Sequence, residues 1–279
     1  MHEIQLHQGD ALELLKALPS GAVDSVILDP PYGRTKLHWD RPLPWPALWP
    51  ELHRIAKPSA NLLIFSQQPF TSELITGNRA NFRYELIWRK SRAVGFLDAR
   101  CRPLRVHENI LLFCQRWRGA GNRMEATYHP QKTPGTPYHK RRENDRRGNR
   151  AAHYGSSSDP FKPTLNASGE RFPHSVIHLA SRNEHGHPTA KPVDLLRWLV
   201  RTYSNPGEVI LDCCMGYGST GIAALLEGRR FIGMEKDPAI FAQAQARLET
   251  YPQASRTHDP IAGYASSVEF VDVTQERDT

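Results

Sequence analysis

The chain has 279 residues, of which 39% are hydrophobic, and its formal net charge is +7. This length allows one large domain, or one domain with a substantial insertion. No apolar run approaches the roughly 20 residues that cross a bilayer, and the N-terminus lacks a secretion-signal pattern, so we expect a cytoplasmic protein without membrane contact. The four cysteines show no CxxC spacing, which argues against a disulfide framework and a cysteine-based zinc site.

Residues 1–115 alternate between strand-like and helix-like runs. Amphipathic stretches predict helices at 10–18 and 45–56. Short apolar runs bounded by Gly and Pro predict strands at 4–8, 24–29, 61–66, 84–89 and 109–115. This alternation is typical of an α/β fold with a mainly parallel sheet.

The stretch from about 116 to 175 lacks this pattern and is rich in Gly, Pro, Ser, Arg and His, so we interpret it as an insertion. Residues 115–182 carry 13 basic and 5 acidic residues, a net charge of +8. The flanking segments, 1–114 and 183–279, have net charges of +3 and −4. A basic segment in a nearly neutral body favours a polyanionic partner such as nucleic acid, although a solvated loop would have the same composition.

Regular structure is predicted again from residue 174 onward. The pattern indicates a strand at 174–180, a helix at 192–204, and then a β-α-β-α unit at 208–214, 219–228, 230–236 and 238–251. Within this unit, Gly216, Gly218 and Gly221 match G-x-G-x-x-G between a strand and a helix. Such a turn lets the backbone approach a ligand closely. Glu235 lies about 19 residues after Gly216, where an acidic residue could accept hydrogen bonds from the ribose hydroxyls of a nucleotide. The turn alone leaves open a dinucleotide, S-adenosylmethionine, or no ligand.

The stretch "SVILDPPYGR", residues 25–34, ends a buried strand with two prolines between Asp29 and Tyr32. One interpretation is a rigid turn, because proline fixes the backbone. The carboxyl ends of parallel strands form one edge of a sheet, where ligands bind. The sequence therefore predicts that Asp29 and Asp212 lie at the same edge.

Three motifs resemble those of the DNA amino-methyltransferases, which methylate exocyclic amines of bases. Asp29-Pro30-Pro31-Tyr32 matches their catalytic motif, (D/N/S)PP(Y/F). "DCCMGYGSTG" at 212–221 is similar to their cofactor motif, DPFMGSGTTG, with Cys214 in place of the usual Phe. "HPTAKP" at 187–192 is similar to their HPTQKP motif. The order of catalytic motif, insertion and cofactor motif resembles the beta group of these enzymes, over about residues 1–114 and 176–250.

This resemblance implies a Rossmann-like, S-adenosylmethionine-dependent methyltransferase fold of the α/β class, with a circularly permuted motif order and a basic, loop-rich insertion. Residues 1–114 would form the catalytic part and 115–182 the target-recognition insertion. Residues 183–250 would form the cofactor-binding part, followed by a C-terminal tail at 251–279.

The resemblance also implies roles for individual residues. The Asp29 carboxylate and the Pro30 carbonyl would each accept one N–H of the target amine. Pro30 and Pro31 would stiffen the turn, and Tyr32 would stack on a base extruded from the duplex. The residues expected to bind S-adenosylmethionine are Asp10, Asp29, Lys191, Asp212, Met215, Gly216, Gly218 and Glu235. Asp10 also fits a helix N-cap, and either role or both stay open.

The resemblance predicts a site-specific enzyme that methylates the N6 amine of adenine in double-stranded DNA, because cytosine-N4 enzymes of this type usually have SPPY where this chain has DPPY. A bacterial or phage-encoded protein at the nucleoid would fit, and a homodimer stays open. Alternatives are a cytosine-N4 enzyme, an RNA or protein amine methyltransferase, and a nicotinamide-dependent oxidoreductase. The insertion residues expected to bind DNA are Arg141, Arg142, Arg146 and Arg147.

Two further groups of residues have a plain structural interpretation beside a functional one. The histidines near residue 180 have zinc-like spacing but no nearby cysteine, and we expect no metal; they are His174, His178, His185 and His187. The tryptophans after the catalytic turn suit packing, or a flap over an extruded base; they are Trp39, Trp45 and Trp49. Glu108, in "HENILLFCQ", is interpreted as part of a core strand.

Overall fold

The computed structural model of the chain describes residues 4–33, 41–119, 123–140, 164–179 and 190–256. The chain forms two compact units. The larger unit consists of residues 1–129 and 175–279, and the smaller one spans Pro130–His174. The predicted insertion at 115–182 includes the whole of the smaller unit.

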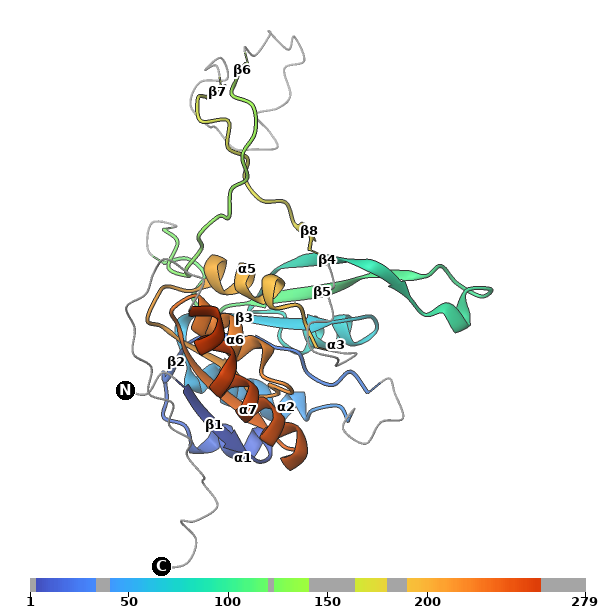
Figure 1. Cartoon of the computed structure of the whole chain (residues 1–279), viewed down its shortest axis with the longest axis vertical. Helices are drawn as coiled ribbons and strands as arrows, with labels where there is room; N and C mark the ends of the chain where they lie inside the picture. Colours follow the sequence, from blue (N-terminus) through green and yellow to red (C-terminus); the bar gives the residue numbers. More distant parts are fainter. Residues whose placement is uncertain (1–3, 34–40, 120–122, 141–163, 180–189, 257–279) are drawn as a thin grey trace, which may run out of the picture. The chain divides into compact units, whose positions relative to one another are not determined.

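The larger unit is built on an eight-stranded sheet with the order β1-β10-β9-β2-β3-β5-β4-β8 (Figure 1). Five of the seven neighbouring strand pairs are parallel, and β5 runs antiparallel to both β3 and β4. The sheet is therefore mainly parallel, as the sequence predicts. The strands are β1 (Ile4–Gln8), β2 (Val23–Leu28), β3 (Ala56–Ser66), β4 (Phe82–Val94), β5 (Arg105–Phe113), β8 (Val176–His178), β9 (Val209–Asp212) and β10 (Arg230–Glu235).

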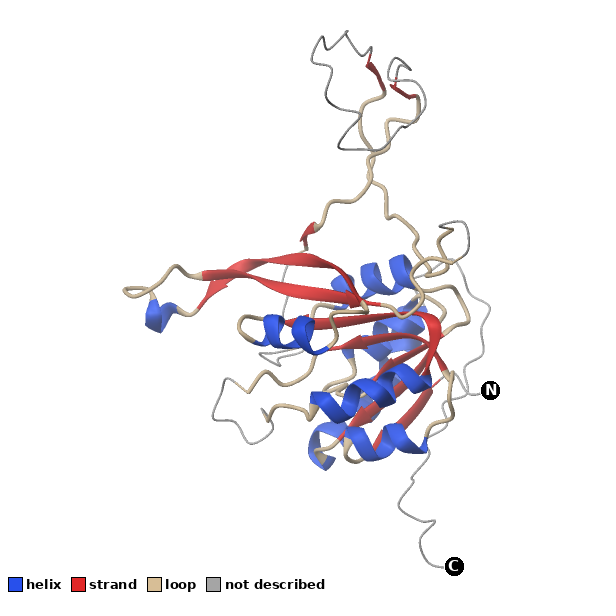
Figure 2. Cartoon of the chain, turned by 180° about the vertical axis from the view of Figure 1, so that it is seen from behind, coloured by secondary structure: helices blue, strands red, loops and turns tan. Residues whose placement is uncertain are grey.

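Helices cover both faces of this sheet (Figure 2). One group packs on one face and comes from the first part of the chain: α1 (Ala11–Ala17), α2 (Trp45–Ile55) and α3 (Phe70–Gly77). The other group packs on the opposite face and comes from the last part: α5 (Val193–Tyr203), α6 (Ser219–Leu226) and α7 (Pro238–Arg256).

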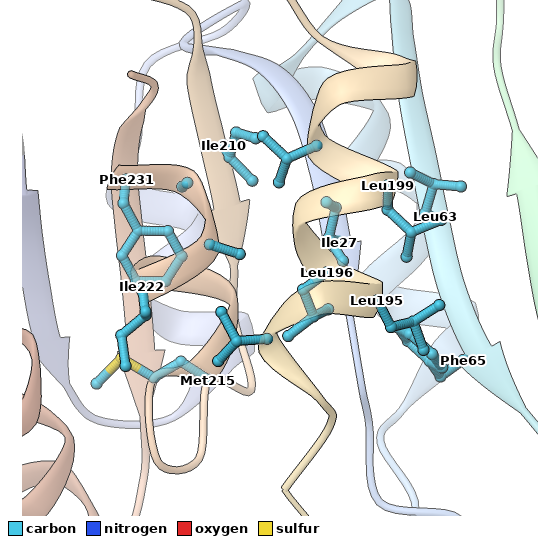
Figure 3. Packing of buried hydrophobic residues seen from close by; sticks show 14 of the residues in the cluster. Ile27, Leu63, Phe65, Leu195, Leu196, Leu199, Ile210, Met215, Ile222 and Phe231 are labelled. Carbon is cyan, nitrogen blue, oxygen red and sulfur yellow. The ribbon is translucent and has the colours of Figure 1, made fainter. Parts of the chain in front are cut away.

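The strands alternate their side chains between these two layers. In β2, Val26 and Leu28 belong to the hydrophobic cluster under α1 and α2, whereas Ile27 belongs to the cluster under α5 and α6. Figure 3 shows Ile27 in this second cluster, together with Leu196 of α5 and Ile210 of β9. Successive residues of a strand point to opposite faces, so a continuous apolar run is what a sheet covered on both faces requires. This explains why β2 ends in an unbroken apolar run, Val26–Leu28.

Most predicted elements are present, with differences at some ends. The strand predicted at 61–66 begins at Ala56, and the strand predicted at 84–89 extends from Phe82 to Val94. The additional residues of β4 are largely polar or exposed, so they lack the apolar signal from which strands are predicted. Helix α3 was not predicted, because eight residues are too few for a clear helical period.

The smaller unit contains a short antiparallel pair, β6 (Tyr138–Lys140) and β7 (Thr164–Asn166). Nearby, an isolated bridge joins Thr133 and Arg171. The Arg171 guanidinium lies 4.9 Å from the centre of the Tyr138 ring, and the Lys132 ammonium lies 5.3 Å from that of Phe172. This part of the chain therefore relies on contacts between cations and aromatic rings as well as on backbone pairing.

Two features of the described residues bear on function. Among the helices of the described ranges, none combines the length and the apolar character needed to cross a membrane. Across the same residues, no group of three or more His, Cys, Asp and Glu side chains is arranged to hold a metal ion. Of the four histidines considered for zinc, His185 and His187 lie outside the described residues.

Candidate active site

The two acidic motifs meet at one edge of the sheet. Strand β2 leads into Asp29 and strand β9 ends at Asp212, and the two strands are parallel neighbours through Ser25–Ile210 and Val26–Leu211. The Asp29 charge raises the pKa of Asp212, which places the two carboxyl groups within electrostatic reach. Residues 183 positions apart in the sequence are thus brought to the same strand ends, as the sequence predicts.

Asp29 is partly buried, and both of its carboxylate oxygens accept hydrogen bonds. The Tyr32 hydroxyl donates to Oδ1 at 3.1 Å, and the Lys191 ammonium donates to Oδ2 at 2.5 Å. Burial is the largest influence on the pKa of Asp29 and raises it; the Lys191 charge opposes that shift, and the Glu108 charge adds to it. Asp29 is therefore a carboxylate held in place by two donors of the chain itself.

Tyr32 is fixed at its hydroxyl and along its ring. Its ring lies 5.6 Å from that of Phe70, at an interplanar angle of 36°, and the Lys191 ammonium lies 6.0 Å from its centre. Burial raises the pKa of Tyr32 well above its ordinary value, and the Asp29 charge raises it further. Tyr32 therefore stays protonated and donates a hydrogen bond to Asp29, and its orientation is set by that bond and by the Phe70 ring.

The tryptophans considered after the catalytic turn have packing roles where they are described. Trp45 lies 5.0 Å from Trp49 and 5.8 Å from Phe70, measured between ring centres. Trp49 is buried and packs against Phe113 at 4.9 Å. Together these rings form an aromatic layer behind Tyr32. Trp39 lies outside the described residues.

Lys191, predicted to bind the cofactor, contacts Asp29 and a second carboxylate. Its ammonium lies 3.5 Å from Oε2 of Glu108 and 5.1 Å from the centre of the Phe65 ring. Sequence reasoning assigned Glu108 to the core and did not include it in the site. A carboxylate just before the apolar run Ile110–Phe113 was the one available signal. Ala190 and Pro192 of the same motif are described, whereas residues 187–189 are not.

The glycine-rich turn has the backbone conformation that its sequence suggests. Gly216 and Gly218 both adopt positive φ, +50° and +74°, and Gly218 caps the start of α6. A side chain at Gly216 would meet nothing within 4 Å, so space is open above the turn. The Gly216 N–H donates to Oε2 of Glu235 at 3.1 Å. An open glycine turn beside a carboxylate fits a ligand with hydroxyl groups and an extended chain.

Asp212 is almost fully buried at the start of this turn. Its Oδ1 accepts the Cys214 N–H at 3.0 Å. Burial raises the pKa of Asp212 to about 7, and hydrogen bonds from Thr220 and Cys214 oppose that shift. Met215 is also buried, and it packs in the hydrophobic cluster under α5 and α6 (Figure 3). Its backbone N–H donates to the Met234 carbonyl at 2.9 Å, which ties the turn to β10.

Asp10 caps helix α1 and lies beside the end of β10. Its Oδ1 accepts the Leu12 N–H at 3.0 Å, which is the N-cap interaction that its sequence suggested as one role. Its Oδ2 accepts a hydrogen bond from Lys236, also at 3.0 Å. Both side chains are substantially exposed. Gln8 pairs with Glu235, so Asp10 and Glu235 follow neighbouring strand ends. A ligand between them would face two carboxylates.

Comparison with known proteins defines the class of this chain. Residues 23–246 match the protein family that is described as "DNA methylase", of the N6/N4 type. The chain is 26% identical to the type II methyltransferase M1.MboII of Moraxella bovis over 261 residues, which cover 86% of this chain and 94% of that protein. It is 28% identical to the DNA adenine methyltransferase YhdJ of Escherichia coli over 253 residues, covering 86% and 81%.

Solved structures share this architecture. The M1.HpyAVI complex with S-adenosylmethionine has a TM-score of 0.56 at 22% identity, covering 88% of this chain and 99% of that one. The cytosine-N4-specific PvuII DNA methyltransferase has a TM-score of 0.58 at 14% identity, covering 88% of each. The fold is therefore that of S-adenosylmethionine-dependent DNA methyltransferases.

The chain belongs to the N6/N4 DNA methylase family, and S-adenosylmethionine is its methyl donor. The open turn at Gly216 and the carboxylates of Glu235 and Asp10 fit this molecule, which carries ribose hydroxyls and an extended methionine chain.

Proposed function

We propose that this DNA methyltransferase transfers a methyl group to the N6 amine of an adenine extruded from duplex DNA. The observation that carries the proposal is Asp29, the first residue of DPPY, held at the end of β2 beside the strand end that carries Asp212. Aspartate at this position is the sequence feature that favours adenine over cytosine. The likeness to the adenine methyltransferase YhdJ supports the same choice.

The chain's own residues would position the amine. An exocyclic amine is a weak nucleophile, because its lone pair is delocalised into the ring. The Asp29 carboxylate and the Pro30 carbonyl would each accept one N–H, which favours a tetrahedral nitrogen with a directed lone pair. Pro30 and Pro31 limit the movement of that carbonyl. Tyr32 would offer its ring to the extruded base, since its hydroxyl is held by Asp29.

The other strand ends would hold the methyl donor. When bound, S-adenosylmethionine supplies an electrophilic methyl group on a sulfonium sulfur, and the amine nitrogen that accepts the methyl group then releases one proton. Glu235 would accept hydrogen bonds from the ribose hydroxyls, and Asp10 would lie near the adenine end. Asp212 and the turn at Gly216 and Gly218 would face the methionine part, where an ionised Asp212 attracts a cationic ligand.

The basic insertion at 115–182 would bind the DNA. Its arginines carry the charge needed for phosphate contacts, and arginine also reads guanine through paired hydrogen bonds. Four of the candidates lie outside the described residues: Arg141, Arg142, Arg146 and Arg147. In the described part of the smaller unit, Lys132 and Arg171 lie over aromatic rings, so cationic and stacking groups occur side by side.

Cytosine-N4 transfer is the second candidate, and the likeness of the fold to the cytosine-N4-specific PvuII enzyme favours it. Incubation of unmodified DNA, and of RNA in a parallel reaction, with S-adenosylmethionine labelled on the methyl group, followed by nucleoside analysis, distinguishes the two. We expect the label in N6-methyldeoxyadenosine. Label in N4-methyldeoxycytidine would replace the proposal with the second candidate, and label in RNA alone would refute both.

A further inference from the structure

A buried cluster of charged and polar side chains lies behind Asp29. Lys191 is 10% exposed and lies between two carboxylates, those of Asp29 and Glu108. Glu108 is 5% exposed and also pairs with Lys90, from the neighbouring strand β4. Gln67, which follows β3, donates to Glu108 at 3.1 Å. The cluster therefore joins three strands of the sheet to the segment before α5.

The two oxygens of Glu108 are in different situations. Oε1 is fixed, because both Lys90 and Gln67 donate to it. Oε2 is buried and has no hydrogen-bond partner, and it lies 3.5 Å from the Lys191 ammonium. The nearby ammonium compensates this oxygen only in part for its loss of water, because no hydrogen bond to it is formed. Glu108 thus presents an acceptor that could form a closer contact with the lysine that now donates to Asp29.

The arrangement around Asp29 raises a conflict with its proposed role. Tyr32 donates to one oxygen of Asp29 and Lys191 to the other, so both oxygens are engaged by the chain itself. An incoming amine would have to share Oδ2 with an ammonium group. The methylated nitrogen also becomes cationic before it loses its proton, and an ammonium at the same oxygen would repel it.

We infer that Glu108 is a positioning residue that accepts the Lys191 ammonium from Asp29 when the target amine binds. The inference rests on the proposed role of Asp29 as the acceptor of the amine. In the free enzyme Lys191 holds Asp29, and in the substrate complex its ammonium moves onto Oε2 of Glu108. Oδ2 of Asp29 then accepts the amine N–H instead.

The surroundings of Lys191 favour movement of an ammonium rather than of a proton. Burial opposes the charge on Lys191, but Asp29 and Glu108 outweigh it and raise the pKa of the lysine. Burial likewise raises the pKa of Glu108, but Lys191 and Lys90 outweigh it and lower the pKa overall. The lysine therefore stays protonated and the glutamate ionised. The Phe65 ring, 5.1 Å from the ammonium, provides an apolar and electron-rich wall along which it moves.

A purely structural ion pair between Glu108 and Lys191 predicts different behaviour. Such a pair would anchor the segment before α5 to β5, and its loss would weaken folding and cofactor binding together. A positioning role predicts that cofactor binding persists while the transfer step slows. The two interpretations are therefore separable by kinetics and by the pH dependence of transfer.

The test compares Glu108→Gln with Glu108→Asp and with Glu85→Gln, in the full-length enzyme acting on unmodified DNA with labelled S-adenosylmethionine. Glu85 is an exposed glutamate on β4 that binds Asn109 at 2.8 Å, and its neutralisation is the matched control. For Glu108→Gln we expect kcat to fall roughly 10- to 100-fold, with the dissociation constant of the cofactor unchanged. Glu108→Asp keeps the charge and should recover part of that loss.

The pH profile supplies the second readout. Among the described residues, the groups around Asp29 are Tyr32 from its own turn, Lys191 before α5, Glu108 on β5 and Asp212 on β9, with Lys90 behind Glu108. The Glu108 charge raises the pKa of Asp29, so Glu108→Gln should shift the acid limb of kcat to lower pH. Glu108→Asp should keep the limb of the unmodified enzyme.

Three results would overturn the inference: an unchanged kcat in Glu108→Gln, an unshifted acid limb, or a loss of cofactor binding that accounts for the lost activity. Asp29→Ala, measured in parallel, separates this inference from the proposed function. If Asp29→Ala retains transfer, the role of Asp29 itself is wrong. If Asp29→Ala is inactive while Glu108→Gln is fully active, only the role of Glu108 is wrong.

Discussion

Asp212 offers a quantitative test of the electrostatics at the cofactor edge. It is 2% exposed, and burial raises its pKa from 3.8 to about 7. Because the folded state holds this proton more tightly than the unfolded state, stability is greatest below the unfolded pKa and falls as pH rises toward 7. Above pH 7 the ionised carboxyl should reduce the free energy of unfolding by about 4 kcal/mol, at roughly 1.4 kcal/mol for each pKa unit.

Asp212→Asn removes this titration but keeps an oxygen that can accept the Cys214 N–H. The stability of the variant relative to the unmodified protein should therefore improve by about 3 kcal/mol between pH 5 and pH 8. Urea unfolding of the cofactor-free protein at both pH values measures this change. Asp194→Asn, at an exposed position of α5, is the control for the loss of one carboxylate. If the free energies of unfolding of Asp212→Asn and the unmodified protein differ by the same amount at pH 5 and pH 8, the reasoning is refuted.

Three other predictions follow from the site and the insertion. The affinity for S-adenosylmethionine should strengthen up to about 10-fold from pH 6 to pH 8, because a cationic ligand favours ionised Asp212. The affinity for S-adenosylhomocysteine, which lacks the sulfonium charge, should change less with pH. Equal changes for the two ligands in titration calorimetry would contradict this prediction. Gly218→Ala combines a φ of +74° with a methyl group 3.0 Å from Leu248, so it should lower the melting temperature more than Gly21→Ala, where φ is +67° and nothing lies within 4 Å. Equal decreases in the melting temperatures of the two variants would rule out a destabilising contact with Leu248. Replacing Arg141, Arg142, Arg146 and Arg147 with Ala should weaken DNA binding and flatten its dependence on salt, and an unchanged slope would remove these residues from the interface.

The elements that could be predicted from the sequence are those whose burial is visible as a pattern of apolar residues within the element itself. Strand β2 is covered on both faces, so its apolar run is continuous and easily recognised. The outer part of β4 is exposed, and its pairing with β5 depends on residues that carry no apolar period. Its length therefore followed from tertiary pairing and was not visible in the sequence.

The candidate site shows the same division. DPPY and the glycine turn are local motifs, so their places at the strand ends of a parallel sheet could be expected from sequence. Glu108 lies in the polar first half of β5 and meets Lys191 only through the fold, 83 positions further along the chain. No local sequence pattern predicts the contact between Glu108 and Lys191. The same holds for the contact between Lys191 and Asp29, since the motif of Lys191 suggested the cofactor rather than the catalytic carboxylate.

The most direct test of the account is a single-turnover measurement on Asp29. Asp29→Asn and Asp29→Ala would be mixed with saturating cofactor labelled on the methyl group and with unmodified duplex DNA, and cofactor binding would be measured separately. The account predicts that both variants bind the cofactor with an affinity close to that of the unmodified enzyme, and that methyl transfer to adenine falls by a factor of roughly 1,000 or more, as expected when a charged acceptor at the reacting atom is lost. Transfer at the unmodified rate, or a loss of activity explained by lost cofactor binding, would contradict the central claim.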